Sequence, residues 1–341
     1  MSSKPVILTG LRANNELHIG NYFGALLPMV DMAKNKSKDY QINLFIPDLH
    51  SITTPIDYKK LQDQIMQNLK VFVASGLPLD EPDVHLYRQS YIPAHSELTW
   101  ILDCFTGFGE MSRMTQFKDK KDESKEVSVG LFNYPVMMAA DILLYGAEYV
   151  PVGDDQTQHL EYTRDIAERI NNRFGNIFII PKAVKEQHKF FAKDQGLRIK
   201  DLANPEKKMS KSTESDKGVI FMQDSPETAK KKIMSATTDS AHKVRYDPQN
   251  QPGVSNLIEI YGLIKGKSAK EAEKDFAGQT QYGQFKQNVA ETVAGFLEEF
   301  QAKLADVKEQ DIQKKLIDCE AKMNKQANDT LYKVQKAVGL R

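Results

Sequence analysis

The sequence has few cysteines, no excess of either charge and no long hydrophobic run. Its two cysteines, Cys104 and Cys319, are far apart and form no Cys-x-x-Cys pair, which argues against a disulfide framework and a zinc or iron–sulfur site. Basic and acidic residues both number 46, so net charge neither indicates nor excludes a nucleic-acid partner. Without a membrane-length apolar stretch or a signal peptide, we expect a soluble cytoplasmic protein of about two domains.

The first third of the chain alternates between strand-like and helix-like segments. Apolar runs at 5–9, 42–46 and 84–87 are typical of buried parallel strands. Amphipathic patterns over 18–34 and 58–75 predict helices between them. This order favours right-handed crossovers and therefore an α/β fold with a parallel sheet. A further strand is expected at 149–152, followed by a helix from Asp155 to about Phe174.

The rest of the chain is predicted to be mainly helical. Residues 95–144 have a helical pattern, interrupted by the mixed-charge run 118–126, which is typical of a solvated loop. Residues 181–205 are irregular, and helices are expected from Ser225 to the end, including 284–307 and 311–338. We place a domain boundary near 216–218.

Two segments have the chemistry of phosphate binding. His18-Ile19-Gly20-Asn21 begins the first predicted helix, where unpaired N–H groups favour phosphate and Gly20 allows close approach. Lys208-Met209-Ser210-Lys211-Ser212 places two lysines so close that they repel unless an anion such as a triphosphate lies between them. Taken singly, these segments are equally compatible with a plain helix start and an ordinary basic surface loop.

Together, they resemble the paired His-Ile-Gly-His and Lys-Met-Ser-Lys-Ser motifs of class I aminoacyl-tRNA synthetases. The resemblance implies that an amino-acid carboxylate attacks the α-phosphate of ATP, which is supplied with Mg²⁺. This reaction needs positioning and charge neutralisation more than a protein nucleophile. His18 and Asn21 would contact phosphate, and Lys211, assisted by Lys208, would neutralise the departing pyrophosphate.

More segments narrow the resemblance to the bacterial type of tryptophanyl-tRNA synthetase, over nearly the whole chain. They are 18–22, 113–118, 134–145, 151–156 with Gln158 and His159, 208–212, 245–247 and 252–257. The implied fold is a Rossmann-like catalytic domain (1–216) with a helical dimerisation insertion (about 86–144), followed by an all-helical domain (217–341) that binds the tRNA anticodon. The implied partners are tRNA(Trp), L-tryptophan, ATP and a second copy of the chain.

The segment 134–145 has a side-chain pattern that suits indole. We place Pro135 in a first helical turn, so that Tyr134, Met138 and Asp141 share one face. An ionised carboxylate only accepts hydrogen bonds, which matches the single N–H donor of indole, and we expect phenylalanine to leave Asp141 unpaired. The alternative is a helix residue satisfied by a neighbouring group. His50, at a strand end, either orients this pocket or is a buried structural histidine.

The resemblance assigns further roles. Gln156 with Tyr134 would hold the substrate ammonium, Gly153 and Asp155 would lie near the ribose, Ile199 and Met209 would enclose adenine, and Lys118 would lie near the phosphates, with a charged loop that could close over ATP. The predicted ATP-binding set is Gly10, Leu11, Arg12, His18, Gly20, Asn21, Gly153, Asp155, Ile199, Lys208, Met209, Ser210, Lys211 and Ser212. Arg12 and Asn14 depart from the usual amide and hydroxyl of this family, so the resemblance does not fix the ATP contacts of their loop.

Three other functions remain compatible with parts of the pattern. A tyrosyl-tRNA synthetase shares the fold and the reaction, and a phenol also donates to a carboxylate. A nucleotidyltransferase shares the helix-start motif but usually lacks the second motif. A non-catalytic relative would bind RNA or tryptophan alone. The run Lys230-Lys231-Lys232 is either a solvated helix face or an RNA contact.

Overall fold

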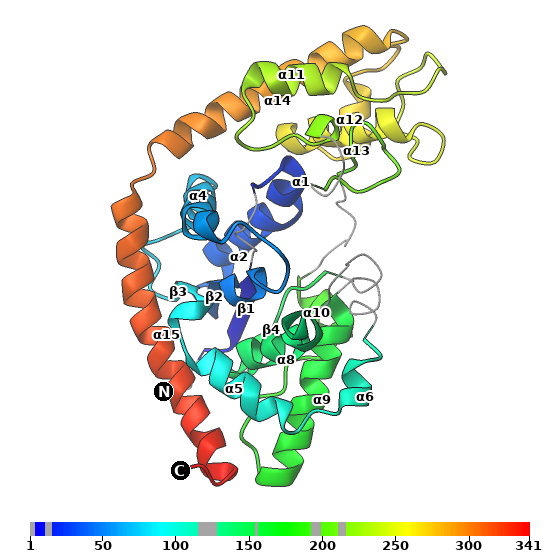
Figure 1. The fold of residues 1–341 in the computed structure, drawn as a ribbon. Helices are drawn as coiled ribbons and strands as arrows, with labels where there is room; N and C mark the ends of the chain where they lie inside the picture. The colour runs from blue at the N-terminus through cyan, green and yellow to red at the C-terminus, as the bar shows by residue number, and fades with distance from the viewer. Residues whose placement is uncertain (1–3, 11–15, 115–127, 154–155, 192–198, 211–215) are drawn as a thin grey trace.

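The computed structural model describes residues 4–10, 16–114, 128–153, 156–191, 199–210 and 216–341. In this part of the chain, one sheet holds four parallel strands in the order β3-β2-β1-β4 (Figure 1). The strands are β1 (Val6–Gly10), β2 (Gln41–Ile46), β3 (Val84–Arg88) and β4 (Ala147–Tyr149). The predicted parallel α/β fold is therefore confirmed.

Helices connect and cover these strands. After β1 come α1 (Ile19–Asn21), a π-helical turn (Tyr22–Leu26) and α2 (Leu27–Lys36); after β2 come α3 (Asp48–Ser51), a 3-10 turn (Tyr58–Lys60) and α4 (Leu61–Ala74). After β3 come a 3-10 turn (Gln89–Tyr91), α5 (Ala94–Asp103), α6 (Phe108–Met111) and α8 (Val129–Leu143). After β4 come α9 (Thr157–Phe174), α10 (Val184–Phe191) and a 3-10 turn (Asp216–Gly218).

The sheet is apolar on both faces, as its parallel strands require. Ile7, Leu44 and Leu86 point into one core, which also contains buried side chains of α2, α4, α12 and α14. Leu8 and Phe45 point into the other, which contains buried side chains of α5, α8 and α9. The strands thus form the middle layer, and their carboxyl ends lie at one edge of it.

Two predicted boundaries were wrong, and a proline is involved in both. The strand expected at 149–152 is β4 at Ala147–Tyr149; Pro151 lacks the N–H that a strand ladder needs. Pro135 lies inside α8 and not in its first turn, because the helix already begins after Ser128. The Ser128 hydroxyl accepts from the Leu131 N–H at 3.0 Å and caps that earlier start.

The predicted helical C-terminal part is confirmed. It consists of α11 (Pro226–Met234), α12 (Pro252–Lys265), α13 (Ala269–Lys274), α14 (Tyr282–Ala305) and α15 (Glu309–Ala337). Figure 1 shows α11 to α14 at one end of the molecule and α15 returning along the edge of the sheet beside β3. The division into domains 1–216 and 217–341 stays a prediction.

One ion pair fastens α15 to the carboxyl end of β3. Arg88 donates from Nε and Nη2 to the two carboxylate oxygens of Glu320, at 2.7 and 2.9 Å, and its backbone N–H also donates to Glu320. The Arg88 guanidinium stacks over the Tyr91 ring at 3.4 Å. The last long helix is thereby joined to the strand end that precedes Gln89.

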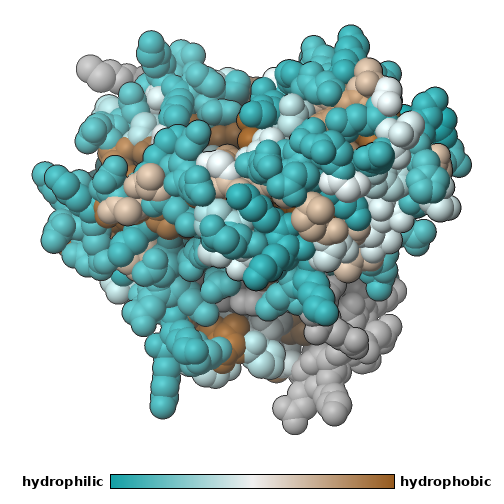
Figure 2. Space-filling view, turned by 90° about the horizontal axis from the view of Figure 1, so that it is seen from above, coloured by the Kyte–Doolittle hydropathy of each residue, from teal (hydrophilic) through white to brown (hydrophobic). Residues whose placement is uncertain are grey.

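Seen from the end that carries α11 to α14, the surface is mainly hydrophilic, with hydrophobic residues in small patches between polar ones (Figure 2). None of the helices that the structure describes combines the length and apolar character needed to span a bilayer.

Candidate active site

Reciprocal hydrogen bonds between His18 and Asn21 close the start of the first helix. The Asn21 N–H donates to His18 Nδ1 and the His18 N–H donates to Asn21 Oδ1, both at 3.3 Å. Because Nδ1 accepts, the neutral ring carries its proton on Nε2. Burial and, second, the positive charge of Lys208 lower the pKa of His18 to about 4, so the ring is neutral at pH 7. His18 is thus a neutral donor, and Asn21 can offer only its amide nitrogen to phosphate.

The helix start is joined to a later part of the chain. The Ile19 N–H donates to the Ile220 carbonyl at 3.0 Å, and the Met222 N–H donates to the Leu17 carbonyl at 2.9 Å. A π-helical turn, Tyr22–Leu26, follows directly, and such turns are frequent at functional sites. The first phosphate-binding candidate is therefore held between β1 and the segment that leads into α11.

The segment containing Lys208 folds back beside this helix start. Met209 donates its N–H to the Ile199 carbonyl at 3.0 Å, and Lys200 forms a β-bridge with Lys208. A Cβ on Gly20 would lie 3.8 Å from the Ile199 Cβ. The structure therefore brings His18, Gly20, Ile199 and Lys208 together, although 190 positions separate the ends of this set in the sequence.

A helix of the C-terminal part supports the Lys208 segment. The side-chain amide of Asn256, on α12, accepts from the Lys200 N–H at 2.8 Å and donates to the Lys200 carbonyl at 3.0 Å. Ile199 and Met209 are 2% and 1% exposed, so both are packed in the core. Ser210 is half-buried.

Gly10 and Gly153 lie at or after the carboxyl ends of β1 and β4, which are neighbours in the sheet. Both glycines are exposed. The connection after β1 leads to β2 on one side of β1, whereas the later strand β4 lies on its other side. The strand order therefore reverses at β1, and ligands of open parallel sheets bind at such a point. A Cβ on Gly10 would lie 2.8 Å from the Phe45 ring and 3.0 Å from the Phe45 carbonyl, so any larger residue here would displace Phe45.

Asp141 is at the centre of a buried hydrogen-bond network. Its Oδ1 accepts from Gln89 Nε2 at 2.7 Å and contacts His95 Nδ1 at 2.6 Å, and its Oδ2 contacts His50 Nε2 at 2.8 Å. Burial alone would raise the pKa of Asp141, but hydrogen bonds from His50 and His95 outweigh burial and lower it to about 2. Asp141 is therefore ionised and 1% exposed.

This network corrects one expectation. Asp141 is not a solitary acid that phenylalanine would leave unpaired, because three protein donors hold it. A carboxylate has about four acceptor positions, so one remains, on Oδ2. His50, which the sequence left open between two roles, contacts Asp141 and packs edge-on against the Tyr134 ring at 6.2 Å.

Tyr134 and Gln156 are connected through a histidine. Tyr134 Oη lies 3.2 Å from His159 Nε2, and His159 Nδ1 lies 2.9 Å from Gln156 Oε1. His159 is fully buried, whereas Met138 is half-buried and packs against the core of α5, α8 and α9. The structure thus brings together Tyr134, Asp141 and His50, and it joins Tyr134 to Gln156.

Six predicted site residues lie outside the described residues: Leu11, Arg12, Lys118, Asp155, Lys211 and Ser212. Their roles stay predictions, as does the closing loop after Lys118. Among the described residues, no group of three or more His, Cys, Asp or Glu side chains is arranged to hold a metal ion.

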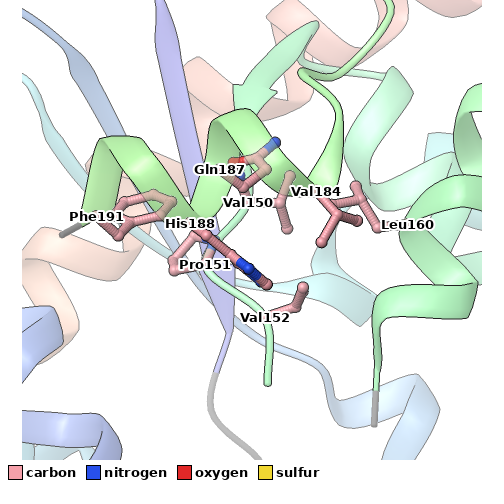
Figure 3. A pocket seen from close by; sticks show the side chains of 8 residues that line it. All are labelled: Val150, Pro151, Val152, Leu160, Val184, Gln187, His188 and Phe191. Atoms are coloured by element: carbon pink, nitrogen blue, oxygen red, sulfur yellow. Dashed lines mark hydrogen bonds between the residues drawn. The ribbon is translucent and has the colours of Figure 1, made fainter. Parts of the chain in front are cut away.

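A small apolar pocket lies between the segment that follows β4 and the helices α9 and α10. The segment after β4 contributes Val150, Pro151 and Val152, α9 contributes Leu160, and α10 contributes Val184, Gln187, His188 and Phe191 (Figure 3). The His188 ring points toward Pro151 and Val152. None of the predicted site residues lines this pocket.

The structure adds three residues to those predicted from sequence: Gln89, His95 and His159. Gln89 directly follows β3, and polar residues at carboxyl ends of parallel strands are a usable signal. His95 and His159 lie on helices and meet partners from other elements, so no local pattern indicates their role.

A capped helix start that follows β1 lies beside a lysine-bearing segment, an arrangement typical of nucleotide-binding α/β proteins. The family model for class I tRNA synthetases (W and Y) matches residues 2–298. A tryptophan–tRNA ligase of Caldanaerobacter subterraneus is 42% identical over 98% of both chains. The chain belongs to this family of class I tRNA synthetases.

Solved structures agree with this assignment. The tryptophanyl-tRNA synthetase of Mycoplasma pneumoniae is 32% identical and superimposes with a TM-score of 0.83 over 99% of this chain and 98% of its own. The enzyme of Campylobacter jejuni, complexed with ADP and tryptophan, is 32% identical with a TM-score of 0.79 over 98% of this chain and 99% of its own.

Proposed function

We propose that this chain activates L-tryptophan with ATP and transfers it to tRNA(Trp). One observation carries the proposal: the Lys208 segment lies close enough to His18 for its charge to act on the ring. Buried Asp141 lies at the same end of the sheet. Relatives with 42% identity over almost the whole chain are tryptophan–tRNA ligases. The family model spans both tryptophan and tyrosine enzymes, so the choice between them relies on these relatives and the pocket.

The reaction has two steps. In the first, a tryptophan carboxylate oxygen forms a bond to the α-phosphorus of ATP, and the bond from that phosphorus to the oxygen bridging to the β-phosphate breaks. Pyrophosphate leaves, and Mg²⁺ bound with ATP would neutralise part of its charge. In the second, a ribose hydroxyl at the end of tRNA attacks the tryptophanyl carbonyl, and AMP leaves.

The protein groups supply position and charge in the first step. His18 donates from Nε2 to a phosphate oxygen as a neutral ring, because burial and the charge of Lys208 lower its pKa to about 4. Lys208 adds positive charge beside it. Lys211 is assigned to the departing pyrophosphate and Lys118 to the same phosphates on sequence grounds. Donors placed where charge develops are worth about 10²- to 10³-fold in rate each.

The tryptophan pocket is assigned to the face of α8 that bears Tyr134, Met138 and Asp141. The indole N–H would donate to the remaining acceptor position on Asp141 Oδ2, beside His50. The substrate ammonium would lie near Tyr134 and Gln156, which His159 links. These contacts fit a substrate with a broad apolar ring and one donor.

A second copy of the chain is the proposed partner of the region 86–144. Three large apolar side chains of this region are strongly exposed: Trp100 (71%), Phe108 (76%) and Val129 (81%). Exposure of this kind indicates an interaction surface. Sedimentation should give a dimer for the parent and monomers for Trp100→Glu combined with Phe108→Glu. An unchanged dimer would place the interface elsewhere.

The tRNA anticodon is proposed to bind the helices after residue 217. Lys231 is exposed there, whereas Lys232 pairs with Asp224 at 2.7 Å and is part of the fold. The predicted cytoplasmic location stays a prediction.

Charging of tRNA tests the whole proposal. Incubation with ATP, tRNA(Trp) transcript and labelled tryptophan should give labelled tRNA, and labelled tyrosine with tRNA(Tyr) should not. Charging with tyrosine alone would assign the chain to the other half of the family. No charging of either tRNA would contradict the proposal.

A further inference from the structure

Asp141 carries unequal numbers of donors on its two oxygens. Oδ1 has Gln89 and His95 at 2.7 and 2.6 Å, which fill its two lone pairs, whereas His50 is the only donor on Oδ2 among the residues that the structure describes. A substrate N–H can therefore bind only at Oδ2. Gln89 and His95, by occupying Oδ1, therefore decide that the substrate is recognised at Oδ2.

His95 is itself held by hydrogen bonds at both ring nitrogens. Asp141 is ionised and accepts only, so His95 Nδ1 carries a proton. His95 Nε2 lies 2.9 Å from Tyr145 Oη. Burial raises the pKa of Tyr145, so its hydroxyl keeps its proton. Tyr145, His95 and Asp141 thus form one chain of hydrogen bonds.

This chain is buried in the core rather than in contact with solvent. His95 is 0% exposed, and its ring lies 5.6 Å from that of Tyr145 and 6.4 Å from that of Tyr87. Ala94 and Leu98, its neighbours on α5, are part of the same core. His95 can therefore act on a substrate only through Asp141.

We propose that His95, fixed by Tyr145, is a positioning residue for substrate selection: it occupies Asp141 Oδ1 and thereby directs the substrate N–H to Oδ2. This rests on the proposed function, in which Asp141 receives the indole N–H. A buried histidine with only a structural role would affect all substrates equally. A positioning role affects substrates that have the N–H and spares those that lack it.

The test compares L-tryptophan with 3-(benzothienyl)-L-alanine, in which sulfur replaces the N–H. The readout is kcat/KM in amino-acid-dependent exchange of labelled pyrophosphate into ATP. His95→Leu should lower kcat/KM for tryptophan by about 10- to 100-fold more than for the analogue, which corresponds to a hydrogen bond to a charged group. His95→Asn, whose amide can replace Nδ1 as donor, should restore most of the preference. KM for ATP should stay the same in both.

The matched control is His85→Leu. His85 is also a buried histidine, 2% exposed, but it contacts Lys322 at the edge of the sheet. Its loss should change both substrates by the same factor. Should His95→Leu not fold, Tyr145→Phe, which removes one hydroxyl, carries the test and should shift the preference in the same direction by a smaller factor.

The outcomes separate the two proposals. Equal losses for both substrates in His95→Leu and Tyr145→Phe, with a parent that prefers tryptophan, would overturn the positioning role alone. A parent that does not prefer tryptophan over the analogue would overturn the assignment of Asp141 to the indole N–H, and with it this inference. A parent without exchange for any amino acid would overturn the proposed function.

Discussion

At the residue scale, the site depends on histidines whose ring nitrogens have specific hydrogen-bond partners. His18 accepts at Nδ1 from the helix start and keeps a proton on Nε2. His50 and His95 donate to Asp141, and His159 lies between Tyr134 and Gln156. Four of the seven histidines of the chain are thus used at one edge of the sheet.

Replacing His18 by Asn tests its role as a neutral donor. Asn can still cap the helix start but lacks a group at the position of Nε2, so the fold should persist. Pyrophosphate exchange should show a fall of about 10²-fold or more in kcat, with little change in KM for tryptophan. A kcat equal to that of the parent would remove His18 from the phosphate site.

Sequence reasoning found Asp141 and His50 but not the network between them. The pattern on α8 places Tyr134 and Asp141 on one face, because helical spacing is a local property. The donors Gln89 and His95 come from the turn after β3 and from α5, which meet α8 only in the folded chain. Local spacing contains no information on such contacts, so the number of hydrogen bonds on Asp141 could not be predicted.

At the scale of elements, α15 joins the C-terminal helices to the sheet through its contacts with β3. Its bond to β3 through Arg88 and Glu320 lies one residue before Gln89, which donates to Asp141. The strand end that precedes Gln89 is therefore fixed by the last helix of the chain.

Glu320→Gln should weaken this connection. Arg88 and Glu320 side chains are only 15% and 10% exposed, so the change leaves a largely buried guanidinium without its countercharge. We expect a loss of about 2–4 kcal/mol in the free energy of unfolding by urea. Asp329→Asn on the same helix, whose pair with Lys325 is 64% and 80% exposed, is the control and should cost under about 1 kcal/mol. Equal losses in the two variants would show that the buried pair has no special role.

Elements were predicted well where periodicity is long and poorly where proline interrupts it. The two long C-terminal helices were expected within about two residues of α14 and α15, since their patterns extend over many turns. β4 was placed too late and Pro135 too near a helix start, because a short apolar run does not fix its own ends.

At the scale of the whole molecule, acid should destabilise the fold. Burial lowers the pKa of both His18 and His85 to about 4, with help from the charges of Lys208 and Lys322 respectively. The ordinary value of 6.5 applies to the unfolded chain, which therefore binds protons first as the pH falls. The stability that these neutral rings confer is complete above pH 6.5 and is lost as the pH falls toward 4.

Urea unfolding between pH 7.5 and 4.5 measures this loss. Each histidine adds a slope of up to about 1.4 kcal/mol per pH unit within the window. His85→Gln, which does not titrate and lies away from the active site, should reduce the slope by about one histidine. The same slope in parent and variant would contradict the lowered pKa of His85.

The central claim is that the helix start at His18, the Lys208 segment and the pocket at Asp141 form one site that joins tryptophan to AMP. Exchange of labelled pyrophosphate into ATP, measured with each amino acid in turn, tests it most directly. We predict exchange with tryptophan and at least about 10²-fold lower kcat/KM with tyrosine or phenylalanine. Exchange that is faster with tyrosine, or absent with every amino acid, would contradict the account.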